Sequence, residues 1–548
     1  MASTAPPADR GEAPLPGAGI ADAGQGEPAP NLAPDPAAPH APSAFADVKQ
    51  LGLFAAIGSL GYVFWVVGAM EMIERFAYYG VVTVRGLYGT APAASGGLGV
   101  PFEQLRWIFS VWALLQSFVP VLTGGLSDRY GYKETIFAST VVKIAGYLVM
   151  AFFPTYGGFF AGAVLLATGT AIFKPGLQGT LVKATKRENS SMAWGIFYQT
   201  VNIGAFLGPI LAGHMRKLAW RNVFLACAGL ICVNFILLLV YKEPGKEERL
   251  ARLKAARGER GAQGAREESL ARASLRELMR PHVALYILVF SSFWFSFMSI
   301  YDVLPNHIQD WVDTRPLVTA LFNGAEPGFL ADKLIVLSAD RTEILPEGLV
   351  NIDAGMVMIT CFLFAALSGK MRAITSMVLG TGLMALALAL FGATSLGAGI
   401  AFGILVFSVG EMLAAPKFSE FIGNFAPADK KAMYLGFSQM PLAIGWTLEG
   451  LVGLTLYGRY GAKERFAREM LVEQGLPSGK LAAIPEGKAF DELVQILHQD
   501  RFAVTRELYR LHHGEVAIVW YVMAATLLVS ALGIYAYGRW IARREPSG

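Results

Sequence analysis

Long apolar stretches recur along the chain from about residue 51 to residue 541, separated by shorter polar segments. A membrane-spanning helix needs about 20 mostly apolar residues, because each residue adds about 1.5 Å of rise and the hydrocarbon layer is about 30 Å thick. The pattern therefore predicts an all-α membrane protein with about twelve transmembrane helices. The predicted spans are residues 60–88, 106–124, 135–153, 158–181, 193–214, 221–241, 283–304, 350–369, 373–394, 398–422, 433–457 and 516–540.

The predicted spans fall into two blocks of six, which indicates an N-terminal bundle in residues 51–241 and a C-terminal bundle in residues 283–548. Between them, residues 242–282 alternate Glu with Lys and Arg, as in a water-exposed amphipathic helix, and predict a cytoplasmic linker. Residues 1–50 are rich in Ala and Pro and lack the apolar core of a signal peptide, so we expect a disordered cytoplasmic tail. Residues 458–515 are predicted to form an extracytoplasmic insertion before the last span.

The distribution of basic residues predicts the orientation. Short loops rich in Lys and Arg favour the cytoplasm, and most such loops fall on one side if the N-terminus is inside. Arg216, Lys217 and Arg221 oppose this assignment but are outnumbered. We therefore expect a multi-pass protein of the plasma or inner cell membrane with both termini in the cytoplasm. The supporting residues are Arg129, Lys133, Lys183, Lys186, Arg187, Lys370, Arg372, Lys430, Lys431, Arg543 and Arg544.

The composition excludes several classes of protein. The chain is 54% hydrophobic and 16% charged, with a mean hydropathy of +0.44, whereas about a quarter of a soluble domain is charged. A net charge of +4, with basic residues at the ends of apolar runs, argues against a nucleic-acid partner. The three cysteines lie in apolar stretches and predict no metal site. Because we find no nucleophile elbow, HExxH pair or phosphate-binding glycine loop, we expect neither an enzyme nor an ATP-driven pump, and no cofactor besides a proton gradient.

The loop after the second span reads GGLSDRYGYK, from Gly124 to Lys133. It resembles the GxLxDRxGxK pattern of the major facilitator superfamily, which implies the two-bundle fold of those transporters. Asp128, Arg129 and Lys133 are able to pair with helix ends or with charges on a neighbouring span and to break that contact when the cytoplasmic side opens. We interpret them as a gating latch. A simple orientation signal made of positive charges is the alternative.

Charged residues within the predicted first span indicate function, because an ionisable group in a span costs about 2.5–3.5 kcal/mol and is usually paired. Glu71, Glu74 and Arg75 are three and four residues apart and therefore share one face of a helix. Lys174 in the fourth span balances the excess negative charge if the two helices are neighbours. Such a set predicts a proton switch, in which protonation of a carboxylate frees a cation for a substrate carboxylate. A static network of ion pairs is the alternative.

Several motifs resemble the proton-dependent oligopeptide transporter family of the major facilitator superfamily. Residues 71–80 match its ExxERFxYYG motif, and Lys174 with Pro175 matches its Lys-Pro pair. The segment FYQTVNIGAFLGP, residues 197–209, resembles its fifth-span signature, and GEMLAAP, residues 410–416, resembles its tenth-span motif. The resemblance covers both halves of the chain and is stronger in the first.

The resemblance implies roles for individual residues. Glu71, Glu74, Arg75 and Lys174 would couple transport to the proton, and Lys174 would also bind the carboxylate end of a peptide. Tyr79, Tyr198 and Asn202 would hydrogen-bond the peptide backbone, and Glu411 would receive its amino group. For Tyr198 and Asn202, hydrogen bonding between helices is the alternative. For Glu411, the alternative is pairing with Lys417 or another cation.

This sequence departs from the family pattern at positions that bear on the substrate. Val82 stands where peptide-binding members carry an arginine, and Arg85 is a candidate replacement one turn further on. Met298 and Ser299 stand in place of the acidic residue and glutamine of the seventh span. Asp302 lies on the same helical face as Met298 and is a candidate substitute, as is Asp353 in the eighth span. The family's second-span tyrosine is replaced by Ser117.

These observations predict a secondary active transporter that couples the symport of di- and tripeptides, or related small amino-acid-like solutes, to protons by alternating access. The alternative is a proton antiporter that exports drugs or metabolites, which Val82 and Met298 favour. The expected partners are a peptide or other small-molecule substrate, protons and the lipid bilayer. We expect a monomer, the usual state in the superfamily.

Overall fold

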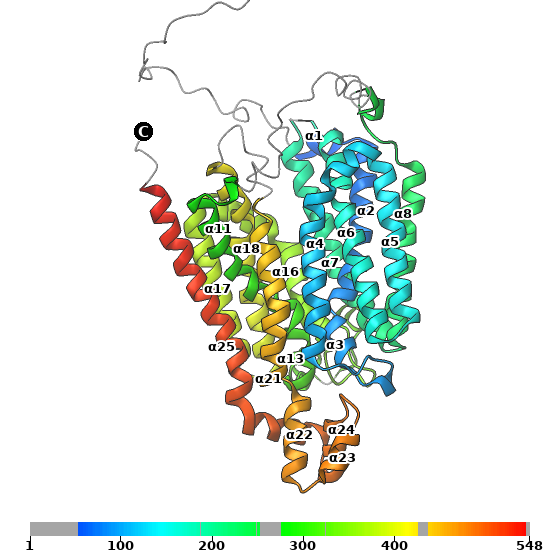
Figure 1. The fold of residues 1–548 in the computed structure, drawn as a ribbon, viewed down its shortest axis with the longest axis vertical. Coiled ribbons are helices and arrows are strands. Elements are labelled where there is room, and N and C mark those ends of the chain that lie inside the picture. Colours follow the sequence, from blue (N-terminus) through cyan, green and yellow to red (C-terminus); the bar gives the residue numbers. More distant parts are fainter. Residues whose placement is uncertain are drawn as a thin grey trace, which may run out of the picture. The chain divides into compact units, whose positions relative to one another are not determined.

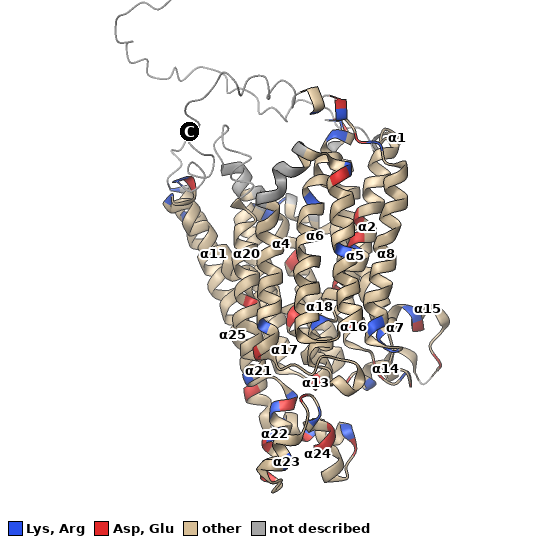
Figure 2. Cartoon of the chain, turned by 45° about the vertical axis from the view of Figure 1, so that its right-hand side comes forward, with Lys and Arg blue, Asp and Glu red and all other residues tan. Residues whose placement is uncertain are grey.

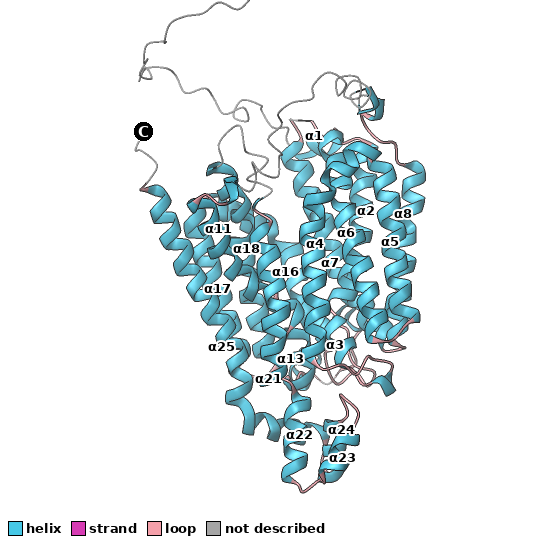
Figure 3. Cartoon of the chain, viewed as in Figure 1, coloured by secondary structure: helices cyan, strands magenta, loops and turns pink. Residues whose placement is uncertain are grey.

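The computed structural model describes residues 53–186, 188–247, 249–251, 276–323, 325–425 and 437–543. The predicted tail 1–50 and most of the predicted linker 242–282 lie outside these residues. Throughout the described ranges the chain forms helices joined by loops, with two isolated β-bridges and no strand (Figure 3). The prediction of an all-α fold is therefore confirmed.

Six long helices of the first half pack side by side (Figure 1). Glycines allow close packing: a Cβ atom on Gly204 would lie 2.5 Å from the carbonyl oxygen of Met72 on the neighbouring helix. Two short helices, α1 (Leu53–Gly58) and α3 (Arg85–Thr90), flank the first long helix. The long helices are α2 (Tyr62–Val82), α4 (Phe102–Tyr130), α5 (Tyr132–Phe152), α6 (Tyr156–Ala184), α7 (Ser190–Arg216) and α8 (Trp220–Val240).

The second half forms a comparable bundle, but two of its spans are interrupted. The first continues from α11 into the short α12, and the fifth consists of α20 and α21 joined by the π-helix η3. Helix α7 packs against α16, and α4 packs against α20, η3 and α21, so these helices join the two bundles. The helices are α11 (Pro281–Phe297), α12 (Ser299–Asp302), α16 (Pro346–Gly369), α17 (Ala373–Ala393), α18 (Gly397–Phe425), α20 (Met440–Leu448), η3 (Glu449–Gly453), α21 (Leu454–Tyr460) and α25 (Arg501–Ala542).

The composition of these helices fits a membrane. Within the described part of the chain, nine helices are long and apolar enough to cross one. Three of the twelve spans are not among the nine: α2, which carries three charged residues near its middle, α4, and the eleventh span, which η3 divides into shorter pieces. Most Lys, Arg, Asp and Glu lie at the helix ends and on the segment before α25, and a smaller number lie midway along the helices (Figure 2).

Two segments between the helices of the second half carry short helices. The first contains α13 (Leu304–Trp311), α14 (Arg315–Phe322) and α15 (Phe329–Ile335). The second contains α22 (Lys463–Glu473), α23 (Ser478–Ala483) and α24 (Ala489–Leu497), which we call the cap. The cap has its own apolar core, in which the ring of Trp311 from α13 lies against the ring of Phe466.

The last span is longer than predicted. Helix α25 begins at Arg501, fifteen residues before the expected start at residue 516, and runs unbroken for 42 residues. The Asp500 carboxylate caps it by accepting hydrogen bonds from the Phe502 and Ala503 amides. Val504 and Leu508 in its first turns are buried in the core of the cap. Residues 501–515 are largely polar, as is typical of a helix that extends out of the membrane. The apolar pattern therefore did not predict that they continue the last span as one helix.

Candidate functional site

The charged residues of α2 form a buried cluster. Arg75 pairs with Glu71, whose Oε1 lies 3.3 Å from the guanidinium Nε, and also with Glu74. All three side chains are at least nine-tenths buried. Spacings of three and four residues bring these groups to one face of the helix, as the sequence predicted. Buried charges of this kind are tolerated only when they are paired.

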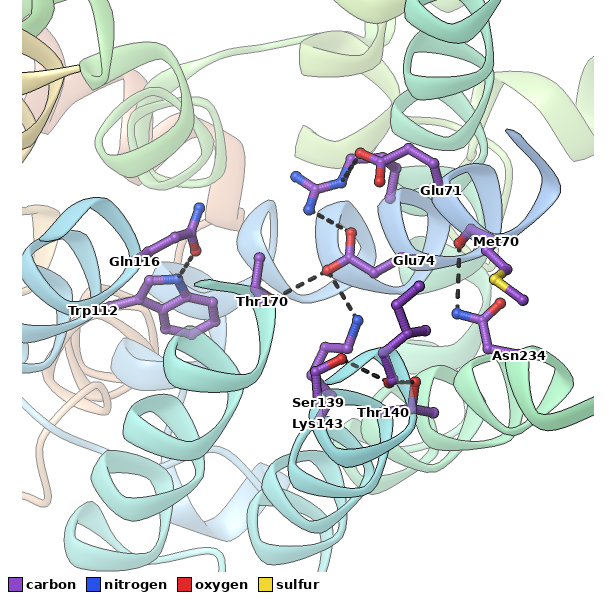
Figure 4. Close-up of polar contacts among 12 residues, drawn as sticks. Met70, Glu71, Glu74, Trp112, Gln116, Ser139, Thr140, Lys143, Thr170 and Asn234 are labelled. Atoms are coloured by element: carbon purple, nitrogen blue, oxygen red, sulfur yellow. Dashed lines mark hydrogen bonds and ion pairs between the residues drawn. The ribbon is translucent and has the colours of Figure 1, made fainter. Parts of the chain in front are cut away.

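A third cation, Lys143 on α5, completes this cluster and was not predicted. Its Nζ lies 3.5 Å from Glu74 Oε1, and the Thr170 hydroxyl on α6 donates a hydrogen bond of 3.1 Å to the same oxygen (Figure 4). The Lys143 ammonium group also lies 3.6 Å from the centre of the Phe173 ring. The signal in the sequence was a lone lysine in the apolar run STVVKIAGYL.

Lys143 changes the expected charge balance. Lys174 on α6 lies within electrostatic range of Glu71 and Glu74, so the structure brings it to the cluster. The direct cross-helix contact to Glu74, however, is made by Lys143. With two carboxylates and three cations (Arg75, Lys143 and Lys174), the ionised set carries one excess positive charge, whereas the four predicted residues alone would be neutral. A carboxylate of a bound molecule would neutralise that excess.

The second bundle carries an acidic pair. Asp353 on α16 is buried and accepts hydrogen bonds from Ser408 Oγ at 2.6 Å and from the Tyr301 hydroxyl at 3.2 Å. Glu411 on α18 has Asp353 as its charged neighbour. Its Oε2 is buried and accepts no hydrogen bond from the described residues. The charged group that acts on Glu411 is thus Asp353 and not Lys417, the partner that the sequence offered as an alternative, so the structure brings two carboxyl groups together.

The predicted polar residues of α2 and α7 lie near this acidic pair. Tyr79 and Tyr198 are both within electrostatic range of Glu411 and Asp353, although they belong to the first bundle. The Tyr79 ring centre is 6.2 Å from that of Tyr301. Tyr198 is 48% exposed, although Glu411 and Asp353 of the other bundle lie within electrostatic range.

Asn202 is buried one turn further along α7 than Tyr198. Its Nδ2 donates no hydrogen bond within the described part of the chain. The alternative of a hydrogen bond between helices is therefore not realised by this amide. An unused buried donor is available to a ligand carbonyl or carboxylate.

A second buried ion pair joins the two bundles. Arg85 at the start of α3 pairs with Asp302 at the end of α12, and neither side chain is exposed. Trp446 Nε1 donates a hydrogen bond of 2.9 Å to the other oxygen of Asp302. The Arg85 guanidinium also lies 4.1 Å from the centre of the Phe109 ring. Arg85 and Asp302, which the sequence suggested as separate replacements for two missing charged residues of the family, therefore pair with each other.

Further contacts between the bundles lie towards the same end of the helices. Asn306 donates a hydrogen bond of 2.9 Å to the Thr90 hydroxyl. Arg216, at the end of α7, donates one of 2.9 Å to the fully buried Glu347 at the start of α16. This is the end at which the cap lies (Figure 1). The bundles are therefore held together at the end of the helices that bears the cap.

The predicted gating motif lies at the turn between α4 and α5. Gly131 has a φ of 118°, which strongly favours glycine, and a Cβ atom there would clash with Glu134. Lys133 Nζ donates a hydrogen bond of 3.0 Å to the carbonyl oxygen of Tyr241 at the end of α8. Asp128 and Arg129 belong to the last turn of α4, and their side chains lie outside the described residues.

Comparisons with known proteins show the family to which this chain belongs. The model of the Major Facilitator Superfamily matches residues 64–448. A region of 154 residues is 31% identical to the peptide transporter YePEPT of Yersinia enterocolitica and covers 27% of this chain and 30% of that protein. A region of 149 residues is 29% identical to the methyl viologen resistance protein SmvA of Salmonella typhimurium, with coverage of 27% and 30%. The aligned regions thus span less than a third of these relatives.

The fold itself is shared with a solved transporter. A crystal structure of the peptide transporter POT in complex with sulfate superposes with a TM-score of 0.62 at 16% identity, over 91% of this chain and 98% of that one. The chain belongs to the Major Facilitator Superfamily, whose model matches more than half of its length. The predicted resemblance to peptide transporters is confirmed by the sequence similarity to YePEPT.

Proposed function

We propose that this protein is a secondary active transporter that imports small peptides or related amino-acid-like zwitterions together with protons. The observation that carries the proposal is the opposite charge of two clusters in the two bundles. The first contains Arg75, Lys143 and Lys174 with a net positive charge, and the second contains Asp353 and Glu411. A zwitterion needs a cation for its carboxylate and an anion for its amino group.

Glu71, Glu74 and Arg75 would couple the substrate to the proton. When Glu74 is ionised, Arg75 and Lys143 are engaged by it. A proton on Glu74 would release one of these cations to bind the substrate carboxylate together with Lys174. Transport and proton binding would then be linked, because each favours the same arrangement of the cluster. Tyr79, Tyr198 and the free amide donor of Asn202 would position the substrate between the bundles.

The cycle would follow alternating access. The contacts Arg85–Asp302, Asn306–Thr90 and Arg216–Glu347 hold the bundles together at the end that carries the cap. If that end is extracytoplasmic, as the loop charges predict, the structure corresponds to an inward-facing state. Lys133, with Asp128 and Arg129, would close the opposite end as the gating latch. We further propose that the protein resides in the cell membrane as a monomer, with both termini in the cytoplasm and the proton gradient as its sole energy source.

A second candidate function is the export of organic cations in exchange for protons. It is favoured by the acidic pair Asp353 and Glu411, which has no basic partner among the charged groups that act on Glu411. The relative named for methyl viologen resistance fits this candidate, because methyl viologen is a dication. In that case the first-half cluster would carry the proton alone.

The two functions are separated by uptake into proteoliposomes that contain the purified full chain. Labelled dialanine is expected to accumulate only under an inward proton gradient, and unlabelled dipeptides should compete. Accumulation that needs no gradient, or equal accumulation by the folded Glu74→Gln protein, would overturn the symport proposal. Efflux of methyl viologen driven by the same gradient, with no uptake of dialanine, would support the exporter instead.

A further inference from the structure

The π-helix η3 begins at a buried carboxyl group that the proposed cycle does not use. Glu449 is fully buried, and neither of its carboxylate oxygens makes a hydrogen bond of regular geometry with the described residues. A π-turn inside an α-helix is rare and is frequently found at functional sites. An orphaned carboxyl at such a turn is therefore unexpected unless it serves a purpose.

Glu449 lies beside the ion pair that joins the two bundles. The charged groups acting on it are Asp302 of α12, its nearest carboxyl neighbour, and Arg85 of α3. Among the described residues, the other packed elements direct no further charge at it. From α4, Ser110 and Phe109 approach Gly450 of η3, while Arg106 turns to the Thr455 hydroxyl. On α20, the Trp446 indole is hydrogen-bonded to Asp302. On α21, the Tyr457 hydroxyl is hydrogen-bonded to Asp310. On α25, Met523 lies beside Gly453.

The charge balance of this site requires a proton. Asp302 is satisfied by the Arg85 guanidinium and by the Trp446 indole N–H. One cation therefore faces two carboxyl groups, and full ionisation would leave one uncompensated negative charge in a dry interior. The desolvation of such a charge costs several kcal/mol, and two carboxyls held close together share a proton instead.

We propose that Glu449 is a proton-binding residue whose protonation permits the two bundles to close at the end that bears the cap. When this end opens, Arg85 leaves with the first bundle, whereas Asp302 and Glu449 stay together in the second bundle and are wetted. A proton from water then forms an O–H bond on Glu449. Arg85 returns to Asp302 only against a neutral Glu449, so closure takes up one proton. The role of this step in transport rests on the proposed alternating-access cycle; the proton-binding site itself does not.

The proton is tested by infrared difference spectroscopy on the purified full chain in lipid. The wild type should show the C=O stretching band of a protonated, buried carboxylic acid at neutral pH, and Glu449→Gln should lose it. Glu103→Gln, which removes an exposed carboxyl on α4, serves as the control and should keep the band. If Glu449→Gln does not fold, Glu449→Asp should shift the band. A band unchanged in the tested Glu449 variant overturns the proposal, whether or not the protein carries peptides.

Closure of the bundles is tested by measuring the distance between two spin labels. The labels are attached at Ala94→Cys and Ala339→Cys, one exposed position on each bundle. The native cysteines are replaced by alanine. In the wild type, raising the pH should increase the fraction of molecules with long distances. In Glu449→Gln, a neutral mimic of the protonated acid, short distances should persist at every pH. An equal pH response in both proteins would refute the gating role. Failure of dialanine uptake by the wild type would overturn the proposed function alone and leave both readouts intact.

Discussion

The ammonium group of Lys143 lies 3.5 Å from Oε1 of Glu74, in a contact between α5 and α2. This contact, together with Arg75, gives Glu74 two cationic partners within the first bundle. Protonation of Glu74 would therefore free one of these cations, because Arg75 also pairs with Glu71. The proposed proton coupling depends on this contact more than on Lys174, which acts on the carboxylates at longer range.

Replacement of Lys143 by Met should remove one of the two cations that respond to Glu74. The resulting cluster would lack the excess positive charge, so a substrate carboxylate would bind more weakly. We expect gradient-driven accumulation of dialanine in proteoliposomes to fall at least tenfold, which corresponds to about 1.4 kcal/mol. Lys183→Met, at the exposed end of α6, is the matched control and should accumulate like the parent. Normal accumulation by folded Lys143→Met would exclude this role.

The Arg85–Asp302 pair should contribute a large coupling energy. Removal of either partner leaves a buried charge uncompensated, which costs about 3–5 kcal/mol in typical buried pairs. A double-mutant cycle with Arg85→Met and Asp302→Asn, measured by unfolding in detergent, should therefore be strongly non-additive. The exposed pair Arg341–Glu326 is the control, and its coupling should be about 0–1 kcal/mol. Additive effects at Arg85 and Asp302 would contradict the observed contact.

Glu411 should distinguish substrates by their amino group. If it and Asp353 receive a positive amino terminus, Glu411→Gln should weaken competition by dialanine more than competition by N-acetyl-dialanine. We expect at least a tenfold change in the ratio of the two inhibition constants. An equal loss for both compounds would mean that Glu411 acts on the protein and does not contact the substrate amine.

The cap should become more stable as the pH rises above neutrality. Burial lowers the pKa of Lys463 to about 8 from 10.5, although Asp310 acts in the opposite direction. Between these two values the unfolded chain binds more protons than the folded one, so stability increases with pH there. The shift corresponds to about 3 kcal/mol.

Substitution of Lys463 tests this dependence. Lys463→Met should raise the unfolding temperature at pH 7, and the advantage over the wild type should shrink as the pH approaches 10.5. Asp310 keeps hydrogen bonds from the Tyr457 hydroxyl and the backbone amide of residue 463 in this variant. The control is Lys480→Met at an exposed site. A difference in unfolding temperature between Lys463→Met and the wild type that stays constant across this pH range would contradict the lowered pKa of Lys463.

Much of the fold could be predicted from the sequence, because the length of an apolar run and the position of its charges follow directly from the thickness of the bilayer. The cluster of Glu71, Glu74 and Arg75 was equally accessible, since helical spacing alone places those groups on one face. Lys143 was missed because pairing between helices depends on which helices are neighbours. Its position within an apolar run was the available signal.

Contacts between the bundles could not be predicted from the sequence either, because they too depend on which helices are neighbours. Arg85 and Asp302 are 217 residues apart, and each was considered singly as a replacement for a missing family residue. The carboxyl pair of Asp353 and Glu411 likewise depends on the packing of α16 on α18. Glu449 was overlooked, although it is an acidic residue within a predicted span, a position that usually indicates function.

Proton movement measured together with peptide uptake tests the central claim most directly. Proteoliposomes that contain the purified protein and an enclosed pH-sensitive dye would be supplied with dialanine at equal internal and external pH, with the membrane potential clamped. We predict that the lumen acidifies as the peptide enters, and that Glu74→Gln abolishes this acidification. Peptide entry without acidification, or an alkaline shift that indicates exchange for protons, would contradict proton-coupled symport.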